Sequence, residues 1–382
     1  MKSIFFILIV VLLSACKGDK GEITVQNKIQ TPQEMLLGNW AVHDTFKKNS
    51  SLYYKYGDDR GFEFLPDSIC EYKNGYIDFE RYRNDTTVDR SERIMYSLGT
   101  KTKYTLTPDS LKVFNLERKK WDSFKIKKLS TDTLIISRDT AWATFIKKNY
   151  DTKNVPDFDA VIVSGSTCFG SCPMVSIMIS KDGSVHYTGE FYVSKKGSYT
   201  SKIAVADFKQ IALRFKQADY IKLKKNYWDS VTDSRTVCVS FIKNGKIIKS
   251  ISDYASSSPN EFVWAYSPLI TLEQKLNGSP EVVPGFIKPE FSMASFSLGN
   301  TQLLLSDSET YYLMYLLRNG KQVSYSFKDK YKLKYKNSLI KEIITDGRYY
   351  KFYFNDKTTK TIDIGYNFIE ESQLVYTFEK NL

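Results

Sequence analysis

Near the middle of the chain stands the segment Cys168–Pro173, which reads Cys-Phe-Gly-Ser-Cys-Pro. Along an extended strand the two cysteine Cα atoms would lie roughly 13 Å apart, because each residue advances about 3.3 Å. That separation is beyond the reach of a disulfide, whereas a helical or tight turn brings such a pair to about 6 Å. Gly170 permits a sharp turn at low conformational cost, and Pro173 suits the exit into a following strand. The segment therefore predicts a turn that can close a small ring.

Four interpretations of Cys168 and Cys172 remain open. A structural disulfide leads, because the start of the chain predicts export to an oxidising compartment, and a ring of about five residues would contribute roughly 2 kcal/mol. A redox-active pair would need two intervening residues at a helix N-terminus. A metal site would need two more ligands, and His186 is the only histidine nearby. Two free thiols are the fourth interpretation. We assign no metal and no cofactor to the chain.

Around this segment, residues 158–277 carry alternating strand and helix patterns. Val161–Val163 predicts a buried strand, and Asn244-Gly245 predicts a tight hairpin, because both of its residues tolerate positive φ. Phe208–Ala218 has helical spacing of apolar residues, and Ser258–Glu261 has the form of a capping box. Strands, a helix, a hairpin and a second helix in this order predict an α+β domain.

The same segment resembles an uncharacterised domain family of bacterial lipoproteins. Its members carry a Cys-x-Gly-x-Cys-Pro signature, followed by alternating strands, a Lys-Asp-Gly turn and a Tyr-x-Gly, which is Tyr187-Thr-Gly189 here. Asp253-Tyr254, after the Asn-Gly hairpin, fits the same pattern. The resemblance covers about 115 residues and implies a fold, but no activity.

Residues 1–15 have the form of a secretory signal, with a lysine followed by the apolar run Ile4–Leu13. About ten apolar residues are too few for a mature membrane span. Leu-Ser-Ala before Cys16 resembles the lipobox of bacterial lipoproteins, which implies that Cys16 is lipidated and anchors the chain to a membrane. Lys17 at the next position implies outer-membrane delivery by the same resemblance. The alternative is a plain cleavable signal with an incidental cysteine. Residues 16–34 are expected to be a flexible tether.

Residues 35–149 contain short strand patterns separated by turn signals, which predicts an antiparallel β-barrel or sandwich. The opening Gly38-Asn-Trp40 resembles the Gly-x-Trp of lipocalin-like bacterial domains. That resemblance implies an up-and-down barrel with Trp40 at the closed end. Such a barrel either holds one small ligand or is filled by its own side chains. Trp121 and Trp142 are expected in its core.

Residues 278–289 are rich in proline and glycine and predict a linker, followed by a third part at residues 290–382. Ser306–Glu309 is a second capping-box pattern, and Asn319-Gly320 predicts the end of the helix it begins. Only strand patterns follow, so this part is expected to be a β-rich α+β domain. The alternating lysines of Lys330–Lys336 indicate a solvated or edge strand, with an anion site as the alternative.

The composition of the 382 residues is that of a folded globular chain, with 42% hydrophobic and 26% charged residues. The 15% aromatic content favours strands. A formal net charge of +12 is spread along strands rather than gathered in one run, so we expect no nucleic-acid partner.

Enzyme signatures are scarce. The chain has two histidines and lacks a phosphate loop and a dinucleotide fingerprint. His43 is interpreted as structural, and Cys70 and Cys238 as buried single thiols. Paired carboxylates could still hydrolyse glycosides without a histidine. The candidate carboxylates are Asp182, Glu190, Asp229, Asp233 and Asp253.

The sequence thus predicts a lipid-anchored protein of the cell envelope with three domains, which binds or scaffolds rather than catalyses. Its partner would be an envelope protein or a small apolar ligand in the first domain. The alternative is a hydrolase of envelope polysaccharide that uses paired carboxylates. Two carboxylates about 5 to 9.5 Å apart in an open, aromatic-lined cleft would favour the hydrolase.

Overall fold

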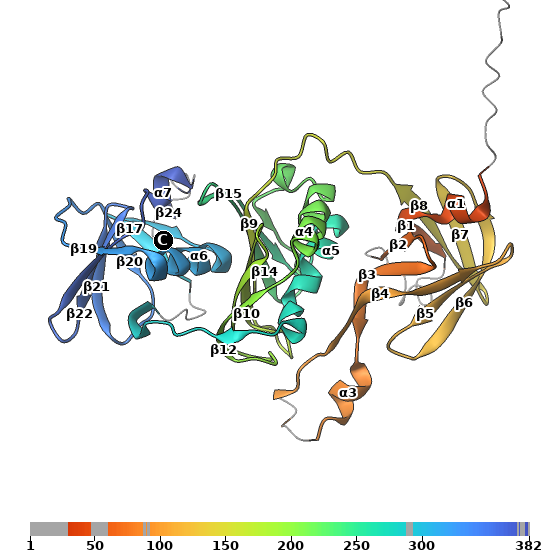
Figure 1. Cartoon of the computed structure of the whole chain (residues 1–382), viewed down its shortest axis with the longest axis horizontal. Coiled ribbons are helices and arrows are strands. Elements are labelled where there is room, and N and C mark those ends of the chain that lie inside the picture. Colours follow the sequence, from red (N-terminus) through yellow and green to blue (C-terminus); the bar gives the residue numbers. More distant parts are fainter. Residues whose placement is uncertain are drawn as a thin grey trace, which may run out of the picture.

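The computed structural model describes residues 30–46, 60–86, 89, 92–287, 293–372, 374 and 379–380. The predicted signal, Cys16 and the tether up to residue 29 lie outside these residues. Figure 1 shows three bodies in a row, a closed barrel and two eight-stranded sheets with helices. This confirms the predicted fold class, a β-rich multidomain chain that contains an antiparallel barrel. Within the described part of the chain, no helix has both the length and the apolar character of a membrane span.

Eight antiparallel strands form the barrel, which closes where β1 pairs with β8. They are β1 (Gly38–Phe46), β2 (Gly61–Leu65), β3 (Ile69–Ile77), β4 (Ser97–Leu106), β5 (Ser110–Asn115), β6 (Lys120–Leu129), β7 (Thr133–Arg138) and β8 (Ala141–Lys148), with α3 (Phe79–Asn84) between β3 and β4. The expectation that Trp121 lies in the core is wrong, because the two-residue period of β6 points Asp122 and Phe124 inward and leaves Trp121 45% exposed. Trp142 is also in an outward position, between the buried Ala141 and Ala143.

One end of the barrel is closed by the short helix α1 (Pro32–Leu36), which occupies the last residues of the predicted tether. Thr31 caps this helix in a capping box with Glu34. The fully buried Trp40 donates from its indole Nε1 to the carbonyl oxygen of Leu36 at 2.7 Å. Below this end, aromatic side chains such as Phe64 fill the interior. In this half of the barrel the described side chains form a packed core.

The middle body is a sheet in the order β13-β15-β14-β9-β10-β11-β12-β16, antiparallel except for β13 with β15. Its strands are β9 (Ala160–Gly165), β10 (Val175–Ser180), β11 (Ser184–Gly189), β12 (Gly197–Lys202), β13 (Asn226–Tyr227), β14 (Thr236–Lys243), β15 (Lys246–Tyr254) and β16 (Ser279–Pro280). Helices α4 (Val205–Gln217) and α5 (Asn260–Ile270) cover one face, with the short 3-10 helices η2 (Tyr220–Lys222) and η3 (Leu272–Lys275) after them. Val161 and Val163 pack under these helices, as their buried-strand pattern predicts.

Of two local predictions for this body, the hairpin is confirmed and the capping box is not. Asn244 and Gly245 form the predicted hairpin, with φ of 51° and 73°. The predicted capping box at Ser258 is wrong. Ser258 donates its backbone N–H and its hydroxyl to the buried carboxylate of Asp253, and α5 starts at Asn260 without a side-chain cap. The hydrogen bonds to the buried Asp253, five residues earlier, therefore replace the predicted cap.

The third body is a sheet in the order β19-β23-β22-β21-β20-β17-β18-β24. Its strands are β17 (Ser295–Leu298), β18 (Thr301–Leu304), β19 (Lys321–Val323), β20 (Tyr331–Lys334), β21 (Ile340–Thr345), β22 (Tyr349–Phe354), β23 (Thr359–Asp363) and β24 (Glu379–Lys380), with helices η4 (Gly285–Ile287), α6 (Asp307–Asn319) and α7 (Phe368–Glu371). The capping box of Ser306 and Glu309 is confirmed. Gly320 follows α6 as predicted, at a point where any Cβ would lie 2.5 Å from a carbon of Ile362.

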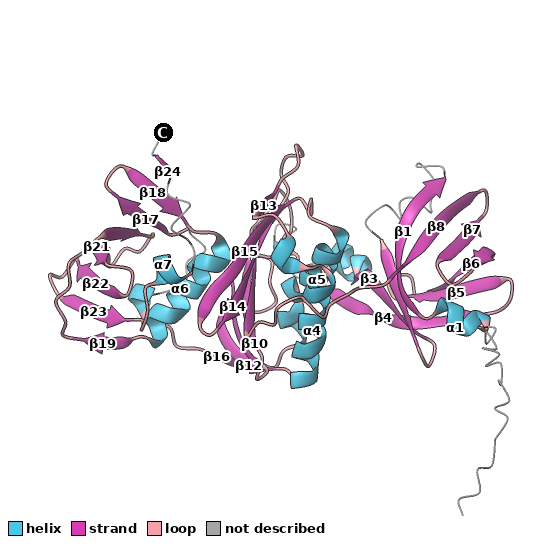
Figure 2. Cartoon of the chain, turned by 90° about the horizontal axis from the view of Figure 1, so that it is seen from above, coloured by secondary structure: helices cyan, strands magenta, loops and turns pink. Residues whose placement is uncertain are grey.

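Helix α6 lies between the middle sheet and the C-terminal sheet (Figure 2). Its Leu313 shares one apolar cluster with Ile162 and Met178 of the middle sheet and with Phe296 and Phe352 of the C-terminal sheet. At the start of the helix, Ser308 hydrogen-bonds to the buried Ser240 of β14 at 2.8 Å. The middle sheet is thus buried on both faces.

The barrel packs against the helix-covered face of the middle body. The indole of Trp264 on α5 lies so close to β2 that a Cβ on Gly61 would be 2.7 Å from its ring. Arg214 on α4 forms an ion pair with Glu71 of β3, whose side chain is 5% exposed. Tyr150, at the end of β8, hydrogen-bonds to Glu261 at 3.4 Å. Apolar and charged contacts together hold the two bodies side by side.

Candidate ligand-binding pocket

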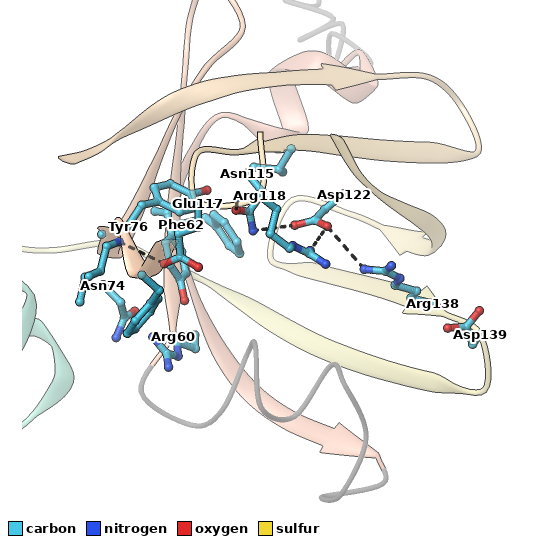
Figure 3. Close-up of a pocket in the computed structure, with 15 residues that line it drawn as sticks. Arg60, Phe62, Asn74, Tyr76, Asn115, Glu117, Arg118, Asp122, Arg138 and Asp139 are labelled. Carbon is cyan, nitrogen blue, oxygen red and sulfur yellow. Dashed lines mark hydrogen bonds and ion pairs between the residues drawn. The ribbon is translucent and has the colours of Figure 1, made fainter. Parts of the chain in front are cut away.

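At the end of the barrel away from α1, the described residues leave a cavity of about 580 Å³ that enters the interior. The β5–β6 turn, the β7–β8 turn and the end of β3 surround this mouth. Figure 3 shows the side chains that line it. They are Arg60, Phe62, Tyr72, Asn74, Tyr76, Phe79, Val113, Asn115, Glu117, Arg118, Asp122, Arg138 and Asp139, with Gly75 and Ile77. The volume is within the usual range for small-molecule pockets.

One wall of this barrel-mouth pocket is a polar network centred on Asp122. Its carboxylate accepts a hydrogen bond from Asn115 Nδ2 at 3.1 Å and forms ion pairs with Arg118 and, at 3.5 Å, with Arg138. The Asp122 side chain is 5% exposed, so these partners offset the cost of burying a charge. Glu117 accepts the backbone N–H of Ile77 at 3.1 Å. The wall is fixed by its own bonds before any ligand arrives.

The opposite wall and the floor are aromatic. The rings of Phe62 and Tyr72 lie 5.3 Å apart, and those of Tyr72 and Tyr76 5.0 Å apart. The guanidinium of Arg60 lies 5.9 Å from the centre of the Tyr72 ring. Burial raises the pKa of Tyr76, so its hydroxyl stays protonated at neutral pH. The pocket can accept an aromatic or apolar body on its floor and a polar group against its wall.

The described side chains fill the half of the barrel beside α1, and they leave a cavity at its mouth. That this cavity holds a small ligand stays a prediction. The sequence did not identify the pocket residues. A usable signal was present, because Asn115 and Asp122 lie at inward positions of β5 and β6, in step with Val113 and Phe124. Polar residues at inward positions of a strand mark either a pocket or a buried network.

Cys168 and Cys172 form the disulfide that led the four interpretations, with Cα atoms 5.5 Å apart. The loop is held from two sides. Phe169 donates its backbone N–H to the carbonyl oxygen of Asp233 at 3.1 Å, and Ser171 Oγ bonds to the hydroxyl of Tyr82 on α3 at 2.8 Å. The bridge therefore shapes a loop that the barrel touches.

The other two cysteines that the structure describes are free thiols in different bodies. Cys70 is buried in the barrel core and Cys238 in β14 of the middle sheet. Burial raises the pKa of both, that of Cys238 to about 12. Neither is a reactive thiolate at neutral pH. Among the described residues, no group of three or more His, Cys, Asp and Glu side chains is arranged to hold a metal ion.

The five candidate carboxylates are not brought together. Asp182 caps a turn through Ser184, and Glu190, Asp229 and Asp233 are exposed. Asp253 is fully buried and accepts hydrogen bonds from Ser258 and from the hydroxyl of Tyr266 at 2.9 Å. Asp253 thus supports the core under α5 and faces no cleft.

Comparison with known protein families matches residues 159–273 to a family described as Domain of unknown function (DUF6438). The matched segment runs from β9 to η3 and includes the disulfide. It agrees with the prediction that the middle of the chain is a domain of an uncharacterised family. A search of curated proteins found no match.

Proposed function

We propose that the chain is a lipid-anchored protein of the cell envelope whose barrel binds a small amphiphilic molecule. The observation that supports binding is the barrel-mouth pocket, with an aromatic floor and a polar wall that is already satisfied. Such a preformed site favours binding because little has to be ordered when a ligand enters. The anchor, outer-membrane location and export are supported by the N-terminal pattern that ends at Cys16.

The alternative is a hydrolase of envelope polysaccharide, and three carboxylates line the pocket, those of Glu117, Asp122 and Asp139. Asp139 lies on the exposed β7–β8 turn, and the two carboxylates further inside already have partners. Asp122 is held by Asn115, Arg118 and Arg138, and Glu117 is held by the backbone of β3. A carboxylate that acts on a sugar must instead face the substrate and exchange protons with it. The geometry therefore favours binding over hydrolysis.

The neutral fluorescent amphiphile phenylnaphthylamine provides a direct test with the purified full chain. We expect the unaltered chain to bind this probe saturably. Val113→Phe should bind it about tenfold more weakly, which corresponds to about 1.4 kcal/mol, because the larger ring would enter the cavity and displace part of the ligand's contacts. The matched control is Val231→Phe, at an exposed loop position outside the pocket, which should bind as the unaltered chain does. Circular dichroism checks that both variants are folded.

Three results would contradict the proposal. The first is the absence of saturable binding to the unaltered chain, and the second is unchanged binding by folded Val113→Phe. The third is release of reducing sugar from envelope polysaccharide that is lost in Glu117→Gln, which would establish the hydrolase instead. Mass spectrometry of small molecules that co-purify with the chain would then identify the natural ligand.

A further inference from the structure

A second cavity, of about 330 Å³, lies between the barrel and the middle body. Its barrel side is made by the ends of β3 and β4, and its other side by the disulfide loop at Cys172 and Pro173 and by α4, α5 and η3. Residues 74–77 of β3 line both this cavity and the barrel-mouth pocket and form the partition between them. We call it the interdomain cavity.

The two bodies are fixed together at the edge of this cavity. Gln274 of η3 uses both ends of its side-chain amide on the barrel. Its Oε1 accepts the N–H of Ser97 at 2.9 Å, and its Nε2 donates to the carbonyl oxygen of Met95 at 2.9 Å. The bond between Tyr82 and Ser171 holds the disulfide loop to the barrel on another side. The cavity is therefore a feature of the assembled chain and belongs to neither body alone.

The charge of the interdomain cavity is one-sided. Arg214, Arg235 and Lys275 line it, and no Asp or Glu does so among the described residues. By contrast, the barrel-mouth pocket balances three arginines with three acidic side chains. A partly buried cavity whose charged side chains are all positive favours an anion, because the attraction between these side chains and the anion is screened less than at the surface.

Within the described part of the chain, two of the three cations have no hydrogen-bond acceptor. Arg214 is paired with Glu71, but no described residue accepts a hydrogen bond from the guanidinium of Arg235 or the ammonium of Lys275. Asp253 attracts Arg235 from nearby, although its oxygens are already bonded to Ser258 and Tyr266. Burial lowers the pKa of Arg235, because it disfavours the charged form of the guanidinium. A bound anion would offset that effect.

One feature opposes an anion. The last turn of α5 borders the cavity at Ile270 and Thr271, and helix C-terminal carbonyls carry partial negative charge. That effect amounts to about half an elementary charge, against the two positive charges of Arg235 and Lys275, for which the described residues supply no ion pair. Hydroxyl groups of Ser97, Ser267 and Thr271 also line the cavity and can donate hydrogen bonds to an oxyanion.

We propose that the interdomain cavity binds a small molecule through a phosphate or carboxylate group, held by Arg235 and Lys275. The planar guanidinium of Arg235 suits two-point recognition of such a group, and Lys275 adds a point charge at the entrance. The Cys168–Cys172 bridge contributes by fixing Cys172 and Pro173 as one wall. This site is separate from the barrel-mouth pocket and does not depend on the proposed function.

Isothermal titration calorimetry of the purified full chain with inorganic phosphate, pyrophosphate and citrate tests the proposal. At low ionic strength we expect at least one of the three to bind with a Kd of roughly 1 mM or tighter. Arg235→Gln should weaken this binding about tenfold or more, and Lys275→Gln should weaken it less, because Lys275 is more exposed. The matched control, Lys209→Gln on the exposed side of α4, removes one positive charge away from the cavity and should bind as the unaltered chain does.

Failure to bind any of the three anions would overturn the proposal, as would equal weakening in Lys209→Gln, which would indicate a general charge effect. Phenylnaphthylamine binding separates the two sites. It should be unchanged in Arg235→Gln, which also shows that this variant is folded. Loss of anion binding in Val113→Phe, whose substitution lies in the barrel, would likewise refute two separate sites.

Discussion

The contact between Gly61 and Trp264 predicts a specific coupling between the barrel and the middle body. A methyl group on Gly61 would lie 2.7 Å from Trp264 Cη2 and 3.1 Å from the carbonyl oxygen of Trp40, both shorter than any comfortable contact. The backbone of Gly61 itself is not in the left-handed region, so the cost of Gly61→Ala comes from packing. Overpacking of this kind costs about 1–3 kcal/mol. We expect that loss in the free energy of unfolding.

A double-mutant cycle distinguishes this contact from general damage. Trp264 is buried, and Trp264→Leu should itself cost about 2–4 kcal/mol by leaving a cavity. In the double variant the methyl group introduced by Gly61→Ala has room and fills part of that cavity. The double variant should therefore lose about 1–2 kcal/mol less unfolding free energy than the sum of the two single losses. Guanidinium chloride unfolding of the full chain measures all four members of the cycle.

Gly285→Ala is the matched control, because its Cβ would lie 3.5 Å from Leu339, an ordinary contact, on a backbone that any residue adopts. It should change stability by less than about 0.5 kcal/mol. If Gly61→Ala costs no more than this control, the barrel is not packed against α5 as described. Strict additivity of the losses from Gly61→Ala and Trp264→Leu would equally refute the argument.

Three other perturbations test the disulfide, the anchor and a buried carboxyl. Replacing Cys168 and Cys172 by serine should lower stability by about 2 kcal/mol, and alkylation of the unreduced chain should label neither cysteine; labelling of both would exclude the bridge. Cys16→Ala should move the chain from the membrane to the soluble fraction in cell fractionation, and persistent membrane association would disprove the anchor. Burial raises the pKa of Glu273 despite hydrogen bonds from Ser194. The folded chain then retains this proton at pH values where the unfolded chain has released it. The unaltered chain should therefore lose stability relative to Glu273→Gln as the pH rises above 4.5, the ordinary pKa of glutamate. Thermal unfolding from pH 4 to 8, in steps of about one unit, measures this, and a stability difference between the two proteins that does not change with pH would contradict it.

Local patterns in the sequence were enough where the physics is local. The Asn244-Gly245 hairpin depends only on positive φ at two residues, and the Ser306 capping box on groups three positions apart. The pattern at Ser258 failed because its side chain has a better acceptor in Asp253, five residues earlier on β15. The prediction for Trp121 was wrong because it rested on the apolar character of tryptophan. The alternation along β6 instead places Asp122 and Phe124 inside the barrel and Trp121 outside it.

The sites could not be predicted because their parts are far apart in the sequence. Gln274 bonds to Ser97 across 177 positions, and no periodicity of either segment encodes that contact. The same holds for Ile162 and Met178. Ile162 falls within the predicted buried strand Val161–Val163, but only the fold shows that α6 covers both Ile162 and Met178. Sequence patterns specify which faces must be covered and leave the covering element to the tertiary structure.

This dependence on neighbours bears on what the matched family segment can do alone. Residues 159–273 supply Arg214, Arg235 and the disulfide loop, whereas Ser97 and the β3 edge come from the barrel and Lys275 lies just beyond the match. The segment also leaves Ile162 and Met178 uncovered without α6, which would favour association or aggregation of an isolated domain. Any activity that belongs to the interdomain cavity is therefore a property of the barrel and the middle body together. The disulfide, which is the most recognisable feature of that segment, acts at the same place, since it fixes the wall where the two bodies meet.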